Sequence, residues 1–383
     1  MIPYSTQTIG DDDLEAVREV LSSSYLTCGP KITEFEDSVA SYTGASFAVG
    51  VNSCTSALHL AMIAAGIKPN DRVFVSAISF VASANCARYL GADVDFVDVD
   101  KYTGNMDVDA LEQMLMEAQR LNRLPKAVVA VHMTGRPVNL KKLFELKEKY
   151  GFVLIEDAAH ALGATYEGSK IGSCRYSDIT VLSFHPVKII TTAEGGMCLT
   201  NSEKYYSIMR KYSSHGIEHD KDKLNNKSMP AFYYEMQELG FNYRLSDLQA
   251  ALGVNQMTHL DAFLKKRREL AGEYFELLSG CSQITLPLPD NDKNQSSWHL
   301  YQIGIKGDRR NEIYQKMREK GIGVQIHYLP IYDHPYYQQI KNYPPLDGAE
   351  YFFAHTVSIP LYPKLKKLDM QFVCAALQSI LDN

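Results

Sequence analysis

Short apolar runs alternate with amphipathic segments between about residues 45 and 200. The apolar runs cover residues 47–51, 73–76, 94–99, 127–131, 153–155, 179–183 and 197–199. Between most of them, apolar positions recur every three or four residues, as at residues 55–65, 108–121 and 140–150. The spacing is typical of amphipathic helices, and the short runs are typical of buried strands. The alternation predicts a large, mostly parallel, seven-stranded sheet with helices on both faces, an α/β fold whose ligands gather at the carboxyl ends of the strands.

The pattern changes after about residue 250, where a smaller α+β unit is expected. Its expected elements are a charged helix at residues 261–278, a polar loop at 287–297, a strand at 298–305, a helix near 309–320 and a strand at 323–328. We therefore divide the chain into a large domain with an N-terminal arm, residues 1–250, and a small C-terminal domain, residues 251–383. The polar segment 218–230 is expected to form a mobile loop.

Composition narrows the classes of partner. The chain has 383 residues, 45% hydrophobic and 22% charged, which is the balance of an ordinary globular protein. With 39 basic and 45 acidic residues and no basic block, nucleic acid is not an expected partner. No apolar run approaches the ~18 residues that span a membrane, and the first residues do not resemble a signal peptide. The seven cysteines are widely spaced and odd in number, which argues against a disulfide framework or a zinc site. We therefore expect that the protein binds no metal and is located in the reducing cytoplasm.

A single lysine, Lys188, stands in an otherwise apolar and small-residue segment. Residues 183–196 read Ser-Phe-His-Pro-Val-Lys-Ile-Ile-Thr-Thr-Ala-Glu-Gly-Gly and follow a predicted strand. Burial disfavours the ammonium form and lowers the pKa of a lysine, which prepares the amine to react with a carbonyl group. The threonine and glycine pairs permit close approach of the backbone to a ligand. The alternative is an ordinary loop lysine without a chemical role.

An acidic pair ends another predicted strand. Residues 153–160 read Val-Leu-Ile-Glu-Asp-Ala-Ala-His, and buried carboxylates are costly unless a cation or a donor meets them. A carboxylate that faces a pyridine nitrogen keeps that ring protonated, and Asp157 is the candidate. His160, three residues on, is a candidate to lie on such a ring or to bond its phenolic oxygen. The alternative is that Asp157 caps a helix at the strand-to-helix turn.

Two further segments predict contacts to the same kind of ligand. Residues 52–58, Asn-Ser-Cys-Thr-Ser-Ala-Leu, follow a strand and open a helix, where free amide groups attract a phosphate; plain capping by Ser53 or Thr55 is the alternative. Phe80, just past the strand 73–76, is suited to stack on a planar ring, although a core position is the commoner fate of phenylalanine. A phosphate, an aromatic ring, a cationic nitrogen and an aldehyde together describe pyridoxal 5'-phosphate (PLP).

The motifs resemble those of a known family. Residues 183–196 resemble the lysine motif of the nucleotide-sugar aminotransferases, the DegT/DnrJ/EryC1/StrS family of fold-type-I PLP enzymes. The resemblance extends over essentially the whole chain. It includes Tyr-Leu-Thr-Cys-Gly-Pro at residues 25–30, the run 156–163, and Gly-Phe-Asn-Tyr-Arg-Leu-Ser-Asp-Leu-Gln-Ala at residues 240–250. One departure is Cys54, where alanine or glycine is common, and we expect it to have little chemical consequence.

The resemblance implies a role for each matching residue. Lys188 would carry the cofactor and then move the proton between the substrate carbon and the cofactor. Asp157 would pair with the pyridine nitrogen, His160 would lie near the ring oxygen and Phe80 would cover the ring. Phosphate contacts would come from Cys54, Thr55, Ser56 and Ser183, and from Asn242 of the other subunit of a homodimer with shared active sites. The substrate contacts would be Tyr4, Ser24, Tyr25, Leu26, Thr27, Cys54, Ser183, Asn242, Gln325, Ile326, His327 and Tyr328.

Within the family, one branch is most similar. The segments Gln-Ile-His-Tyr-Leu-Pro-Ile-Tyr at residues 325–332 and Thr-Thr-Ala-Glu at residues 191–194 resemble the transaminases of pseudaminic acid synthesis. These make UDP-4-amino-4,6-dideoxy-N-acetyl-β-L-altrosamine from a 4-keto sugar, and the resemblance implies L-glutamate as the amino donor. The negative charges of both substrates require cations, for which Arg244 and Arg210 are candidates.

Three alternatives stay open at this point. The chain could aminate another nucleotide keto sugar, such as a precursor of GDP-perosamine or of 4-amino-4-deoxy-arabinose. A PLP-dependent sugar dehydratase on the same fold is a second alternative, although such enzymes typically replace the lysine with histidine. A non-catalytic regulator is the third, and the absence of a basic helix-turn-helix weighs against it.

Overall fold

A seven-stranded sheet forms the centre of the computed structural model, which describes residues 1–382. The strand order is β1-β9-β8-β5-β4-β2-β3, and all neighbours are parallel except β9, which is antiparallel to β1 and β8. Each predicted apolar run forms one strand, so the predicted α/β class is confirmed. The strands are β1 (Phe47–Val51), β2 (Arg72–Ser76), β3 (Asp93–Val97), β4 (Ala127–Val131), β5 (Val153–Asp157), β8 (Ile179–Ser183) and β9 (Gly196–Thr200).

Helices cover both faces of this sheet, which explains why its strands are apolar along their whole length. The strands β4, β8 and β9 are buried at every residue. One face packs against α2 (Pro30–Thr43), α5 (Val108–Arg120), α6 (Leu140–Tyr150) and the first half of α8 (Asp247–Leu278). The other face packs against α3 (Cys54–Ala64), α4 (Ala82–Arg88) and α7 (Glu203–Ser213).

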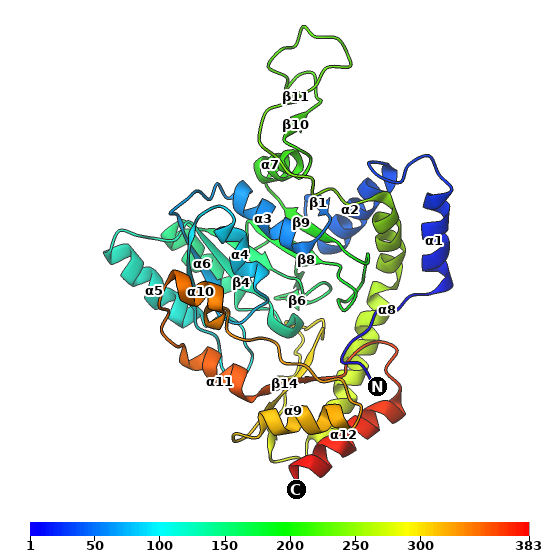
Figure 1. Ribbon diagram of the computed structural model, residues 1–383, viewed down its shortest axis with the longest axis vertical. Coiled ribbons are helices and arrows are strands. Elements are labelled where there is room, and N and C mark those ends of the chain that lie inside the picture. Colours follow the sequence, from blue (N-terminus) through cyan, green and yellow to red (C-terminus); the bar gives the residue numbers. More distant parts are fainter. Residues whose placement is uncertain (383) are drawn as a thin grey trace.

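The helix α8 joins the two parts of the molecule. It begins at residue 247, not at residue 261 as expected, because Ser246 and Gln249 form a reciprocal capping box at its start. The predicted boundary between the domains, at residue 250, therefore falls within the first turn of this helix. The helix α1 (Asp11–Leu21) packs against α8, and the two lie side by side in Figure 1.

A second core lies at the C-terminal end of the chain, shown in yellow to red in Figure 1. Its antiparallel sheet consists of β12 (Ile284–Thr285), β13 (Tyr301–Ile305) and β14 (Thr356–Ile359). The helices α9 (Arg310–Glu319) and α12 (Lys367–Leu381) pack in this core. The buried residues of the 3-10 turn η2 (Ile331–Asp333), of α10 (Pro335–Ile340) and of α11 (Asp347–His355) instead join the core on one face of the large sheet. The strand predicted at residues 323–328 does not form: Gln325 makes only an isolated bridge to Ser358, and the residues after it turn toward a cavity.

Two short hairpins and a 3-10 turn complete the fold. The strands β10 (Ile217–Glu218) and β11 (Glu235–Met236) pair as a hairpin, and this arm, residues 217–236, projects beyond α7 away from the body of the molecule (Figure 1). A smaller hairpin joins β6 (Thr165–Tyr166) to β7 (Ser169–Lys170), and the 3-10 turn η1 (Met133–Gly135) follows β4. Within residues 1–382, no helix is long and apolar enough to cross a bilayer.

Candidate active site

A cavity of about 640 Å³ opens where several strands of the large sheet end. Asp157 and Ser183 are the last residues of β5 and β8, and the segments after β1 and β2 supply the adjoining walls. The segment 325–329 closes the opposite side, so the cavity lies between the two cores. This is the position at which ligands of parallel sheets gather.

Lys188 lies on the wall of this cavity, in the connection between β8 and β9. Its backbone amide donates to the carbonyl of His185, and Ile189 and Ile190 directly after it are buried. Burial lowers the pKa of Lys188 to about 8, although Cys54 and Asp157 act in the opposite direction. The amine is therefore partly neutral near pH 7, as a nucleophile or proton acceptor must be.

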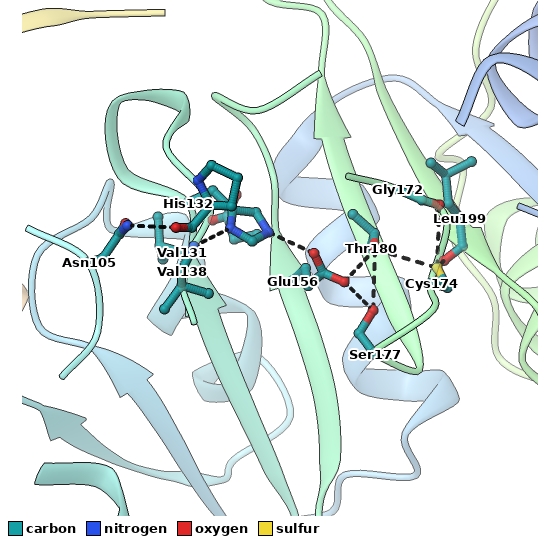
Figure 2. A network of polar contacts seen from close by, with 12 residues as sticks. Asn105, Val131, His132, Val138, Glu156, Gly172, Cys174, Ser177, Thr180 and Leu199 are labelled. Atoms are coloured by element: carbon teal, nitrogen blue, oxygen red, sulfur yellow. Dashed lines mark hydrogen bonds and ion pairs between the residues drawn. The ribbon is translucent and has the colours of Figure 1, made fainter. Parts of the chain in front are cut away.

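The two carboxylates at the end of β5 face opposite sides of the sheet. Asp157 faces the cavity, where its Oδ1 accepts from the amide of Ala159 at 3.1 Å and its Oδ2 accepts from the hydroxyl of Ser83 at 2.6 Å. Glu156 faces the other layer and accepts from His132 and Thr180, as Figure 2 shows. The alternation of side chains along a strand explains why only Asp157 is available to a ligand.

His160 is buried on the cavity wall, three residues after Asp157. Its Nε2 lies 3.3 Å from the hydroxyl of Tyr328, whereas its Nδ1 has no hydrogen-bond partner in the described part of the chain. Burial, with the nearby charge of Lys188, holds the pKa of His160 well below its ordinary value, so the ring is neutral. A neutral, partly unbonded imidazole suits contact with an aromatic ligand.

The N-terminus of α3 forms another part of the wall. Cys54 and Thr55 begin this helix and line the cavity, while Ser53 caps it by accepting from the amide of Ser56 at 3.1 Å. Ser53 also lines the cavity, so the same residue caps the helix and borders the space that a ligand would fill. Free amides at a helix start favour a phosphate.

Aromatic and polar side chains line the mouth. Phe80 lies on the wall with 59% of its surface exposed, so it is not a core residue. Its ring centroid is 6.4 Å from that of Tyr328, and Tyr4 lies 5.4 Å from His327 in the same measure. Gln325 and Ile326 also lie on the wall, which brings the predicted substrate segment together with the predicted cofactor residues.

Other predicted residues lie outside this cavity. Ser56 is buried, with its hydroxyl bonded to Asn52 Oδ1 at 2.7 Å. Asn242 forms a bridge with Ser214 at the base of the arm. The predicted substrate loop is likewise absent from the cavity wall and exposed at its surface; it comprises Ser24, Tyr25, Leu26 and Thr27.

The two arginines proposed as substrate cations are also away from the cavity wall. Arg210 donates to both carboxylate oxygens of Glu36, at 2.9 and 2.6 Å, and is thereby committed to the fold. Arg244 donates to the hydroxyl of Ser214 at 3.1 Å. Among the described residues, Lys188 is the one lysine of the wall, and no arginine lines it.

Sequence reasoning missed several residues of the site. His185 and Glu194 line the cavity within the lysine motif itself, where their position offered a signal. His299, whose ring centroid is 4.4 Å from that of His160, and Ser83 come from distant segments. Nothing in the local sequence marks these two residues.

The residues of the cavity fit PLP on the observations above. A lysine with a lowered pKa, a carboxylate, the imidazole of His160 and a helix N-terminus all line one cavity. These groups correspond to the aldehyde, the ring nitrogen, the ring face and the phosphate of the cofactor.

Comparison with known proteins agrees with this fit. Residues 7–378 match the DegT/DnrJ/EryC1/StrS aminotransferase family. A UDP-4-amino-4,6-dideoxy-N-acetyl-beta-L-altrosamine transaminase of Campylobacter jejuni is 38% identical over 389 residues, covering 100% of this chain and 98% of that protein.

Solved structures extend the likeness to three dimensions. PseC of Helicobacter pylori, an aminotransferase of pseudaminic acid biosynthesis, aligns with a TM-score of 0.91 at 31% identity, covering 100% of this chain and 99% of that one. A sugar aminotransferase, Spr1654 of Streptococcus pneumoniae, aligns in its PLP form with a TM-score of 0.89 at 27% identity, covering 100% and 98%. With its whole length matched and its cavity suited to that cofactor, the chain belongs to the DegT/DnrJ/EryC1/StrS family and is a PLP-dependent sugar aminotransferase.

Proposed function

We propose that the protein aminates C4 of a nucleotide-linked 4-keto-6-deoxy sugar with L-glutamate as the donor. The product would be UDP-4-amino-4,6-dideoxy-N-acetyl-β-L-altrosamine, an intermediate of pseudaminic acid synthesis and so of cell-surface polysaccharide or flagellin glycosylation. Similarity to the C. jejuni transaminase and to PseC supports this substrate. The observation that carries the chemistry is the lowered pKa of Lys188 on a cavity wall shared with Asp157.

Lys188 is the residue that moves the proton. PLP, when bound, withdraws electrons from the substrate bond that breaks. The neutral amine of Lys188 would move a proton from the α-carbon of glutamate to the cofactor in the first half of the reaction, and from the cofactor to C4 of the sugar in the second. Its pKa of about 8 suits both directions, since the amine gains and loses a proton near neutral pH.

The remaining residues of the site would bind the cofactor and orient it. Asp157 would hold a positive ring nitrogen, while Cys54, Thr55 and Ser183 would hold the phosphate from the start of α3 and the end of β8. Phe80 and His160 would enclose the ring, and the aromatic groups at residues 4, 327 and 328 would exclude water from it.

A homodimer would complete the site. The arm exposes apolar side chains that a monomer would leave in water, with Phe232 exposed by 78% and, just after the arm, Leu239 by 80%. Asn242 and the loop 24–27 are predicted site residues that lie outside their own cavity. Contact with the neighbouring subunit's cavity would give both sets a role. The free cysteines fit a cytoplasmic enzyme.

The experiment that tests the substrate is a direct incubation. The purified enzyme would be given glutamate with UDP-, dTDP- and GDP-linked 4-keto-6-deoxy sugars, and the products would be weighed by mass spectrometry. Amination of the UDP-linked N-acetyl sugar above the others is the expected result, and preference for another nucleotide would overturn the substrate. In parallel, borohydride reduction and peptide mapping should place the cofactor label on Lys188; a label elsewhere would overturn the mechanism.

A further inference from the structure

The neighbouring carboxylates Glu156 and Asp157 are bound by the fold in different ways. Glu156 accepts from His132 Nε2 at 2.7 Å, from the hydroxyl of Thr180 at 3.2 Å and from the hydroxyl of Ser177, all in the buried layer shown in Figure 2. The Nδ1 of His132 accepts from the amide of Val138, so the hydrogen of this ring is on Nε2 and points at Glu156. Both oxygens of Glu156 are thus occupied by protein donors.

Asp157 has a different surrounding, in which a chain of two hydroxyl groups ends on one oxygen. Ser83 Oγ donates to Asp157 Oδ2 at 2.6 Å, and Ser79 Oγ lies 2.7 Å from Ser83 Oγ. Because the single hydrogen of Ser83 is used toward the carboxylate, Ser79 must donate to Ser83. The chain is therefore directed from Ser79 to Asp157, and each bond polarises the next.

The fold holds Ser83 rigidly in this role. Ser83 is fully buried in α4, and its backbone carbonyl accepts from the thiol of Cys86 at 3.2 Å. Together with the amide of Ala159 on Oδ1, the hydroxyl fixes the rotation of the Asp157 carboxylate about its side-chain bond.

We propose that Ser83 is a positioning residue, which holds the Asp157 carboxylate turned toward the ring nitrogen of the cofactor. The inference deepens the proposed function and rests on it, because it requires Asp157 to face that nitrogen. Ser83 itself is not among the residues of the cavity wall, so it acts through Asp157 alone. The titratable groups whose charge acts on Asp157, or is acted on by it, are Lys188, Cys54, Cys86 and Tyr328.

The test compares Ser83→Ala with a matched control that acts on Glu156, the neighbour of Asp157 on the other face of β5. Ser177→Ala removes an equally direct hydroxyl donor from Glu156, which does not face the cavity. Each variant would be reconstituted with PLP isotope-labelled at the ring nitrogen, whose NMR shift reports its protonation. The dissociation constant for PLP, the melting temperature and kcat would be measured beside it.

The expected result separates the two serines. Ser83→Ala should move the ring-nitrogen shift toward the unprotonated form and lower kcat by about tenfold, the order of one lost hydrogen bond to a charged group. Ser83→Thr should restore both, because it keeps the hydroxyl. Ser177→Ala should lower the melting temperature while leaving the nitrogen shift at the wild-type value. A Ser83→Ala protein with the wild-type nitrogen shift would overturn the proposal.

Asp157→Asn distinguishes failure of this proposal from failure of the site assignment. If Asp157→Asn changes the nitrogen shift and Ser83→Ala does not, only the positioning role is wrong. If Asp157→Asn also leaves the shift unchanged, Asp157 does not face the ring nitrogen and the proposed site itself is wrong.

Discussion

Lys188 is buried, and burial disfavours the positive charge of its amine. The ordinary pKa of the amine is 10.5, and burial lowers it to about 8 in the folded chain. Folding therefore penalises the protonated amine, and the penalty falls on stability at any pH where the unfolded chain would hold that proton. An uncharged amine on a cavity wall is useful to an enzyme, but it costs the fold part of its stability.

Replacing Lys188 with methionine should expose this cost. In the protein without cofactor, Lys188→Met should be more stable than the wild type by up to about 3 kcal/mol below pH 8, where the penalty is complete. The difference should shrink as pH rises from 8 to 10.5, because the unfolded chain then also loses the proton. Urea denaturation of both proteins across this range measures it, with Lys320→Met, on the exposed end of α9, as the control.

A constant difference between Lys188→Met and the wild type over the whole range would contradict the lowered pKa. The same variant should lose turnover by several orders of magnitude, since the proposed proton carrier is absent. Stability gained and activity lost together would be the signature of a functional residue that the fold tolerates at a cost.

A site residue can be predicted from the sequence when it lies in a short run together with other site residues. Lys188, Asp157 and His160 occur in two short runs whose composition is unusual for their predicted surroundings, so local reasoning found them. Ser83 and His299 owe their place to packing between distant segments, and their neighbours in sequence carry no signal. The predicted site residues of the cavity wall are brought together by the structure, while their individual roles stay predictions.

The helix α8 contains two glycines in opposite surroundings. An ideal Cβ at Gly253 would lie 2.7 Å from ring atoms of Phe35, a buried residue of α2, whereas a Cβ at Gly272 would meet nothing within 4 Å. Both positions are within the helix, where glycine costs backbone entropy relative to alanine. The same substitution should therefore act in opposite directions.

Gly272→Ala should stabilise the protein by about 0.5–1 kcal/mol, because only the helix preference changes. Gly253→Ala should destabilise it by about 1–3 kcal/mol, because the added methyl overpacks the contact with Phe35. Chemical denaturation of both variants beside the wild type measures the two signs. Destabilisation by Gly272→Ala would show that this part of α8 is not an unstrained exposed helix.

At the same scale, the strands were predictable and the small domain was less so. Strands that are buried on both faces consist of continuous apolar runs, so the sequence predicts all seven strands of the large sheet. The segment 323–328 has a strand-like composition, but residues 325–328 line the cavity and only one residue of the segment pairs with β14. The early start of α8 depends on the capping pair Ser246 and Gln249, a signal that was present in the sequence but not used.

The molecule buries most of its apolar side chains in its cores but exposes others on the arm. Its cores are closed by helices, but the arm extends away from them (Figure 1). The arm exposes the apolar side chains of Phe232, Tyr234 and Met236. An extended hairpin of this kind is stable and soluble when a partner surface covers it. The arm, the loop 24–27 and Asn242 are all candidates for contact with a second copy of the chain, and a two-fold dimer would bury each of them twice.

Mixed dimers test whether two chains build one site. If the proposed roles hold, Lys188→Ala and Asn242→Ala should each be nearly inactive as homodimers, since every site lacks either the amine or the proposed phosphate contact. When both variants are co-expressed with different tags, a mixed dimer contains one site with Lys188 from one chain and Asn242 from the other. Random pairing should therefore restore about a quarter of the wild-type activity, because half of the dimers are mixed and each has one complete site. Purification through both tags should raise the figure to about half. If the mixed dimers are as inactive as their parents, Asn242 serves the site of its own chain or none, and the shared-site arrangement is wrong.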